Sequence, residues 1–395
     1  MNALRLLAAA MLALSAAGSW AAAEAPIDID RYLAEPPAPI AKPLPAAWEP
    51  LRARLAEQVR ALVEGPRLAP LRMEIGLAGC EFFFDHSGQT VLSLSLAARH
   101  LPPDLRGKLA DYLEAEIRKY PPHTSGCWYP INEGRRRENY VVTDELLAGS
   151  RRQALAHPFG NVYALWAMAH ELDCWPPVAE RWPEIRDSYR SFRESGWRLD
   201  PAKGDLFANR YLAALVAYVR IARRMNEPTE AEAARRQAEE LAAGIVENWR
   251  RDSQSVLIPK FENVVEFDRW RGEGAGGFFF RVSGHKAKVA RFHDLTPEVA
   301  RLVADHALPA AKVYLDFVDR SLPGWYLAGE ERQFHFGENY VDYPDFAMDI
   351  FLAKAYLEKS PPEKLAGWVD MPWCAGDLYY IEKLALVLDA AAAMP

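Results

Sequence analysis

The chain has 395 residues, of which 50% are hydrophobic and 26% are charged, which is the composition of an ordinary globular protein. Its formal net charge of −7 argues against nucleic acid as a partner, although a local basic patch could still hold an anionic ligand. Helical patterns continue along the chain without a long Gly/Ser linker, so we expect residues 46–395 to form a single domain.

The first 23 residues have the pattern of a cleavable secretory signal. Arg5 supplies the positive charge, Leu6 to Ala17 is apolar, and small residues precede a cleavage site after Ala23. The apolar run is shorter than the ~20 residues that span a bilayer. We therefore expect a bacterial periplasmic or secreted protein with no stable membrane association after cleavage, and the oligomeric state stays open. The Pro/Ala-rich residues 24–45 are predicted to form an extended arm on the outside.

Four cysteines follow the signal, namely Cys80, Cys127, Cys174 and Cys374. An oxidising compartment permits disulfides, and four cysteines allow three pairings, among which we favour Cys80 with Cys127. The alternative is that some are buried free thiols. Because none has the spacing of a zinc site, we expect no metal, and no cofactor is indicated.

The segment Gly204–Arg224 is the clearest copy of a repeated unit. It opens with the polar residues Asp205, Asn209 and Arg210 and continues from Tyr211 to Val219 without a charge. A helix that is apolar on all sides is buried on all sides. The segment therefore predicts an inner helix with a polar start.

The next segment differs, because from Ala234 to Trp249 apolar residues recur at spacings of three and four between charged ones. An inner helix followed by such a one-faced outer helix is one hairpin of an (α/α) toroid, so we predict an all-α fold. Similar polar starts precede apolar segments at residues 85–88, 157–161, 342–346 and 376–379. In a closed ring these starts would meet at one end of a central funnel. The alternative is that each Asn or Asp only caps its own helix.

Further helices are predicted over Trp48–Val63, Pro102–Tyr120, His157–Leu172, Val178–Glu194 and Thr296–Arg320. Long polar segments lie between helices at residues 121–138, 251–295 and 323–346. The glycines within 272–294 are not a dinucleotide fingerprint, because no βαβ unit surrounds them. We interpret 272–294 as an insertion that forms a small β-hairpin or a lid.

Two chemistries suit such a funnel. Glycoside hydrolysis needs one protonated and one ionised carboxyl group, and with inversion the candidates are Asp205 with Asp342 or Asp345. β-Elimination from a uronic-acid polymer instead needs Asn, His or Arg to neutralise the sugar carboxylate, and Tyr or His to move the protons. A non-catalytic carbohydrate-binding toroid is a third possibility.

The polar starts and loops contain more amide, imidazole, guanidinium and phenol groups than carboxylate pairs, which favours elimination. The candidates for the reaction itself are Tyr340, His157, Asn161 and His335. The candidates for holding the substrate are Asn209, Arg210, Arg291, His293, Tyr343, Asn339 and Arg136. For each of these residues the alternative is a helix cap, a core side chain or a solvated charge.

The signal, the single domain and the helix starts HPFGN, GDLFANR and HFGENYVDYPDF resemble the α/α-toroid polysaccharide lyases. The chain is most similar to polysaccharide lyase family 38, whose members act on glucuronan or alginate, over about residues 75–392. The resemblance implies an anionic polysaccharide substrate, Asn and His for charge neutralisation, and Tyr as acid and base. By their chemistry we place these roles on Asn161, His157 and Tyr340. Unsaturated-uronyl hydrolases share the toroid, but their Asp-bearing helices have no convincing match here.

Overall fold

A computed structural model describes residues 26–37, 43–64, 87–119, 121–124, 157–199, 207–256, 292–326, 343–369 and 377–394. Every regular element in these ranges is a helix, which confirms the all-α class. The signal at 1–23, the cysteines Cys80, Cys127 and Cys374, and most of the 272–294 insertion lie outside the described residues. Cys174 carries a free thiol.

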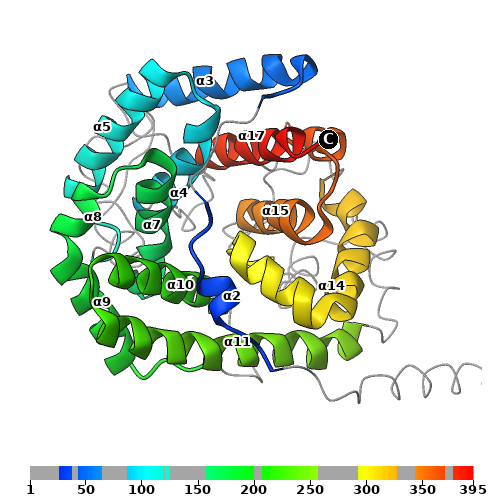
Figure 1. Cartoon of the computed structure of the whole chain (residues 1–395). Coiled ribbons are helices and arrows are strands. Elements are labelled where there is room, and N and C mark those ends of the chain that lie inside the picture. Colours follow the sequence, from blue (N-terminus) through cyan, green and yellow to red (C-terminus); the bar gives the residue numbers. More distant parts are fainter. Residues whose placement is uncertain are drawn as a thin grey trace, which may run out of the picture.

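The helices form an outer and an inner layer (Figure 1). The outer layer contains α3 (Glu49–Val63), α5 (Pro103–Lys119), α8 (Pro176–Glu180), α9 (Trp182–Glu194) and α11 (Pro228–Val256). The inner layer contains α4 (Ser87–Ala97), α7 (Val162–Leu172), α10 (Ala208–Arg224), α15 (Tyr343–Leu352) and α17 (Asp377–Ala392). Inner neighbours pack side by side, with α17 on α4, α4 on α7, and α7 on α10.

Shorter elements and α14 complete the fold. The helix α14 (Pro297–Tyr326) packs on α11 and on the π-helical turn η8 (Ala353–Glu358) that follows α15. The remaining short elements are α2 (Asp30–Leu33), η1 (Ala46–Trp48), η2 (Ala98–His100), η3 (Pro158–Asn161) and α16 (Pro362–Ala366). No helix within the described ranges combines the length and apolar character needed to cross a membrane.

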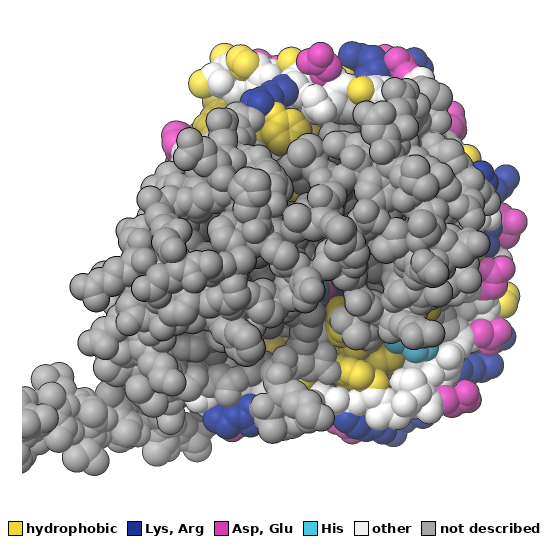
Figure 2. Space-filling model, turned by 180° about the vertical axis from the view of Figure 1, so that it is seen from behind, with side chains coloured by type: hydrophobic (Ala, Val, Ile, Leu, Met, Phe, Trp, Pro, Cys, Tyr) yellow, Lys and Arg dark blue, Asp and Glu magenta, His cyan; other side chains and the backbone are white. Residues whose placement is uncertain are grey.

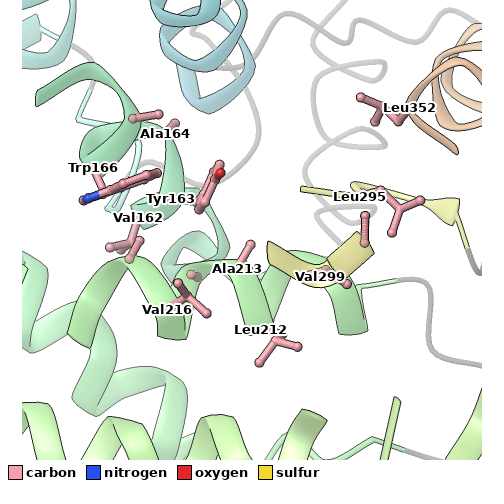
Figure 3. Packing of buried hydrophobic residues seen from close by; sticks show 14 of the residues in the cluster. Val162, Tyr163, Ala164, Trp166, Leu212, Ala213, Val216, Leu295, Val299 and Leu352 are labelled. Atoms are coloured by element: carbon pink, nitrogen blue, oxygen red, sulfur yellow. The ribbon is translucent and has the colours of Figure 1, made fainter. Parts of the chain in front are cut away.

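Burial follows the sequence pattern that predicted the two layers. In α10 every residue from Tyr211 to Ala222 is buried, and Figure 3 shows Leu212 and Ala213 in the cluster that also contains Val162 of α7. In α11 the buried residues recur along one face, for example Ala234 and Ala238, while charged residues lie between them. Figure 2 shows acidic and basic side chains mixed along the right-hand edge of the molecule. Burial of the apolar faces therefore places α10 inside and α11 outside.

Prolines account for two departures from the predicted helices. The helix expected over Val178–Glu194 is divided between α8 and α9, because Pro183 lacks the N–H group that would continue the hydrogen-bond ladder. In α14 the backbone is non-helical at Ala307, two residues before Pro309, which is the usual position of a proline kink.

Within the N-terminal segment, residues 30–33 form a short helix whose apolar side is buried. Ile29, Tyr32 and Leu33 are buried, and α2 packs against α10 and α14 near the centre of the view in Figure 1. The buried Arg220 of α10 donates to the carbonyl oxygens of residues 32, 33 and 34 at distances of 3.1, 3.3 and 2.8 Å. A compositional bias toward Pro and Ala therefore concealed a short helix with one buried apolar side, in a segment whose other residues are mostly exposed.

Candidate functional site

A cavity lies where the polar starts of the inner helices meet. Residues from α4, α7, α10, α15, α17 and the turn before α14 line it, and its volume is about 60 Å³, enough for a few water molecules. The polar side chains of this lining are Gln89, Asn161, Tyr163, Arg210, Asp294, Thr296, Asp349, Tyr379 and Glu382. The structure therefore brings two of the predicted site residues, Asn161 and Arg210, to one place.

Glu382 is a buried carboxyl group that neutral side chains hold in place. Its Oε2 accepts hydrogen bonds from Gln89 Nε2 at 2.6 Å and from Ser93 Oγ at 2.7 Å, both on successive turns of α4. Burial raises the pKa of Glu382 to about 7, and the negative charge of Asp294 adds to the rise against the opposing effect of the two hydrogen bonds. Near neutral pH this carboxyl group is therefore present in both protonated and ionised forms.

His293 lies between two carboxylates. Its Nδ1 is 3.0 Å from Asp349 Oδ2, and its Nε2 is 3.1 Å from Asp294 Oδ2. Burial alone would lower the pKa of His293, but Asp294 and Asp349 outweigh it and raise this pKa to about 9. At neutral pH the ring is therefore an imidazolium that donates from Nδ1 to Asp349 and forms an ion pair with Asp294 through Nε2.

Arg210 and its neighbour Asn209 hold the turn that carries Asp294. Arg210 Nε donates to Asp294 Oδ2 at 2.7 Å, and Asn209 Nδ2 donates to the carbonyl oxygen of His293 at 2.7 Å. A Cβ atom at Gly160 would come within 2.8 Å of Arg210 Cδ, so a residue without a side chain gives Arg210 room at this point. Both predicted substrate-binding residues thus contact the protein's own chain.

Asn161 reaches the cavity, whereas His157 does not line it. The Asn161 amide is buried, and its Nδ2 donates to the carbonyl oxygen of Pro122 at 2.9 Å. The His157 ring instead packs 5.6 Å from the Phe192 ring, with its Nε2 3.3 Å from Ser191 Oγ on α9. Its Nδ1 accepts from the backbone N–H of Phe159, so His157 is the cap of η3 and faces the outer layer.

The remaining candidates lie wholly or partly outside the described residues. His335, Asn339, Tyr340, Arg136, Arg291, Asp205 and Asp342 lie outside the described residues. Tyr343 and Asp345 belong to the first turn of α15, but their side chains are outside the described part of the structure.

The residues that dominate the cavity were not singled out from the sequence. Asp349 is the one acid in the apolar segment FAMDIFLA, and Glu382 lies in YYIEKLAL, where the neighbouring Lys383 is the only other charge; all three side chains are buried. Acidic side chains are almost never fully buried unless they are paired, so an acid in a helix that is apolar all round is a usable signal. The sequence prediction covered only the helix starts, whereas Glu382 and Asp349 lie farther along α17 and α15.

Comparisons with known proteins gave no match. Neither the protein-family models, nor the curated proteins, nor the solved structures contain a significant similarity to this chain.

The cavity combines two carboxyl groups in opposite environments. Asp294 faces two cations, Arg210 and His293, which stabilise its ionised form. Glu382 faces the neutral groups of Gln89 and Ser93. Among the described residues, no group of three or more His, Cys, Asp or Glu side chains has an arrangement suited to a metal ion. Such a pair can supply a proton from one side and accept a proton on the other.

Proposed function

We propose that the protein is an enzyme that hydrolyses glycosidic bonds of a polysaccharide at this cavity, with Glu382 as proton donor and Asp294 as base. We further infer that its two helical layers are an (α/α) toroid. The alternation of outer and inner helices in Figure 1, and the packing of successive inner helices on one another, support this architecture.

The unequal environments of the two carboxyl groups carry the proposal. Glycoside hydrolysis requires one carboxylic acid to protonate the leaving oxygen while the other, as a carboxylate, activates water. Burial with neutral partners favours a protonated Glu382, and the ion pair with Arg210 favours an ionised Asp294. Asp294 is more accessible than Asp349 of α15, with 23% of its side chain exposed against 4%.

The reaction would proceed in one displacement. Glu382 donates its proton to the glycosidic oxygen as the bond from that oxygen to the anomeric carbon breaks. Asp294 takes a proton from a water molecule, whose oxygen forms the new bond to the anomeric carbon with inversion. A cavity of about 60 Å³ holds water but not a whole sugar, so the sugar ring would lie at its opening.

β-Elimination from a uronic-acid polymer is the second candidate. The presence of Asn161 and Arg210 at one cavity favours it, because an amide and a guanidinium can hold a sugar carboxylate. Against it, Arg210 and His293 already bind Asp294 and Asp349, and a substrate carboxylate would compete with these pairs. The tyrosine proposed for proton transfer, Tyr340, lies outside the described residues.

One assay separates these reactions. The purified protein is incubated with glucuronan, alginate and neutral glycans, while reducing ends and ultraviolet absorbance are followed together. Reducing ends without a new chromophore support hydrolysis, and the chromophore of an unsaturated sugar end would establish elimination instead. If neither reducing ends nor the chromophore forms but the protein still binds the glycans, a carbohydrate-binding protein would be favoured. Glu382→Gln should abolish hydrolysis while preserving the fold, because the amide keeps the shape but donates no proton.

A further inference from the structure

A second recess, which we call the outer groove, lies in the outer layer between α9, α11 and residues 197–199. It is much larger than the cavity, at about 810 Å³. Its charged lining consists of Arg190, Arg193, Arg198, Arg236, Glu194 and Glu240. Arginine therefore outnumbers glutamate in the outer groove, although the whole chain is negatively charged.

Two of these arginines have no carboxylate partner in the described part of the chain. Arg193 lies 5.8 Å from the centre of the Tyr189 ring, and Arg198 Nη1 donates to the backbone carbonyl of Trp197 at 2.8 Å. Arg190 differs, because its Nη2 donates to Glu230 at 2.7 Å. Both Arg193 and Arg198 are exposed, so their guanidinium groups are accessible to an anion.

One side chain of the outer groove carries an unsatisfied acceptor beneath the surface. Gln237 belongs to its lining, and the Oε1 of Gln237 is buried without a hydrogen-bond partner within the described residues. The hydroxyl of Tyr189, next to Arg193, is also buried and unpartnered in the same part of the structure. This oxygen is enclosed, so a ligand hydroxyl would pair with it after the amide turns toward the outer groove, and the pairing would remove the cost of an unsatisfied buried acceptor.

An aromatic side chain provides an apolar surface at the same place. Trp197 is half-buried in the lining, and its ring packs 4.5 Å from that of Tyr211 and 5.8 Å from that of Phe192. These contacts fix its orientation. Sugar rings have apolar faces and hydroxyl edges, so a fixed indole beside hydrogen-bonding groups suits them.

We propose that the outer groove binds a chain of an acidic polysaccharide. Arg193 and Arg198 would hold its anionic groups, Gln237 would accept from a hydroxyl, and Trp197 would contact a ring face. The volume lies within the range of about 300–1,000 Å³ that is typical of ligand sites. The inference goes beyond the proposed hydrolysis, and it holds whether or not the cavity is catalytic.

The test measures binding without turnover. Polyglucuronate is titrated into Glu382→Gln protein, and the dissociation constant is compared with that of the same protein carrying Arg193→Ala and Arg198→Ala. We expect the double substitution to weaken binding at least tenfold. Arg52→Ala with Arg60→Ala is the matched control, because it removes the same charge from α3 and should leave the affinity unchanged.

Two further polymers complete the design. A neutral glucan should bind at least tenfold more weakly than polyglucuronate, and so should polyglutamate, an anion without sugar rings. Equal affinity for polyglutamate would overturn saccharide recognition, since charge alone would then explain binding. Equal polyglucuronate affinity in the Arg193/Arg198 variant and its control would remove the outer groove as the site. Hydrolysis by the wild-type protein is measured separately, so failure of the catalytic proposal would not be mistaken for failure of this one.

Discussion

Glu382 of α17 accepts a hydrogen bond of 2.6 Å from Gln89 of α4, a residue 293 positions earlier in the chain. The contact joins the last inner helix to the first, next to the packing of α17 on α4. It also places a buried acid in the cavity. The same interaction thus contributes to holding α17 against α4 and to setting the protonation of Glu382.

The raised pKa of Glu382 predicts that this residue destabilises the protein at high pH. Its pKa of about 7 exceeds the usual 4.5, so the folded state binds more protons than the unfolded state between these values. Stability therefore falls as pH rises through this window, by on the order of 3 kcal/mol for a group shifted this far. Glu382→Gln removes the titration, so its melting temperature should match that of wild type near pH 4.5 and exceed it at pH 8.

The comparison of the two proteins isolates Glu382, because other titrating groups contribute equally to both. A difference in melting temperature that does not change between pH 4.5 and pH 8 would contradict the prediction. Gln89→Leu is a useful companion, because it removes a hydrogen bond to the ionised form and should raise the pKa of Glu382 further.

His293, unlike Glu382, should stabilise the folded protein at neutral pH. Its pKa of about 9 lies above the usual 6.5, so its contribution to stability is complete below pH 6.5 and disappears as pH rises through 9. His293→Gln should therefore destabilise most near pH 6, by on the order of 2–3 kcal/mol, with a smaller difference near pH 9.5. Thermal unfolding at both values measures this effect, and NMR titration of His293 in Asp349→Asn protein should show a lowered pKa.

The glycines of the cavity offer a steric test with an internal control. A Cβ atom at Gly88 would lie 2.4 Å from Asn161 Oδ1, so Gly88→Ala must displace a buried amide that donates to Pro122. We expect it to lower the free energy of unfolding by about 1–3 kcal/mol. Gly107→Ala in α5 meets no atom within 4 Å and should instead stabilise by about 0.5–1 kcal/mol through helix propensity. If both substitutions changed stability in the same direction, the close approach at Gly88 would be disproved.

Sequence patterns predicted the helices better than the site. Uncharged runs such as that of α10 identify a helix buried on all sides, because an unpaired charge is costly to bury. The convergence of helix starts placed Asn161 and Arg210 at the cavity. The direction of each side chain and its tertiary partners could not be predicted from local patterns, because they depend on residues that are distant in sequence.

His157 and Glu382 illustrate the two failures. His157 precedes an inner helix, but the intervening η3 lets its ring face α9 rather than the cavity. Glu382 lies within an apolar helical run, where only the facing Gln89 and Ser93 of α4 reveal its role. The short helix of the N-terminal segment was missed for a similar reason, because the composition of the segment gives no indication of its partner Arg220, which lies 187 residues from Leu33.

Arg220 is expected to keep the N-terminal segment docked. Its guanidinium binds the carbonyl oxygens of residues 32–34 and Glu298 Oε1 at 2.7 Å, while it lies 4.3 Å from the Trp166 ring centre. Arg220→Met preserves the bulk but removes this donor from the three carbonyl oxygens, and it removes the cationic partner of the buried Glu298 carboxylate, which keeps a hydrogen bond from the Tyr163 hydroxyl. We expect a loss of about 3–5 kcal/mol in the free energy of unfolding and faster proteolysis at residues 26–37.

The matched control for Arg220 is Arg223, one turn further along α10. Arg223 is 47% exposed and pairs with Asp30 at 3.1 Å on the surface, so Arg223→Met should cost at most about 1 kcal/mol. Limited proteolysis with mass spectrometry then locates the first cleavage in each variant. Protection of residues 26–37 in Arg220→Met protein, at wild-type level, would mean that the apolar contacts of Ile29, Tyr32 and Leu33 hold the segment without the arginine. Early cleavage there in Arg220→Met alone would show that one buried cation fixes the N-terminal segment between α10 and α14.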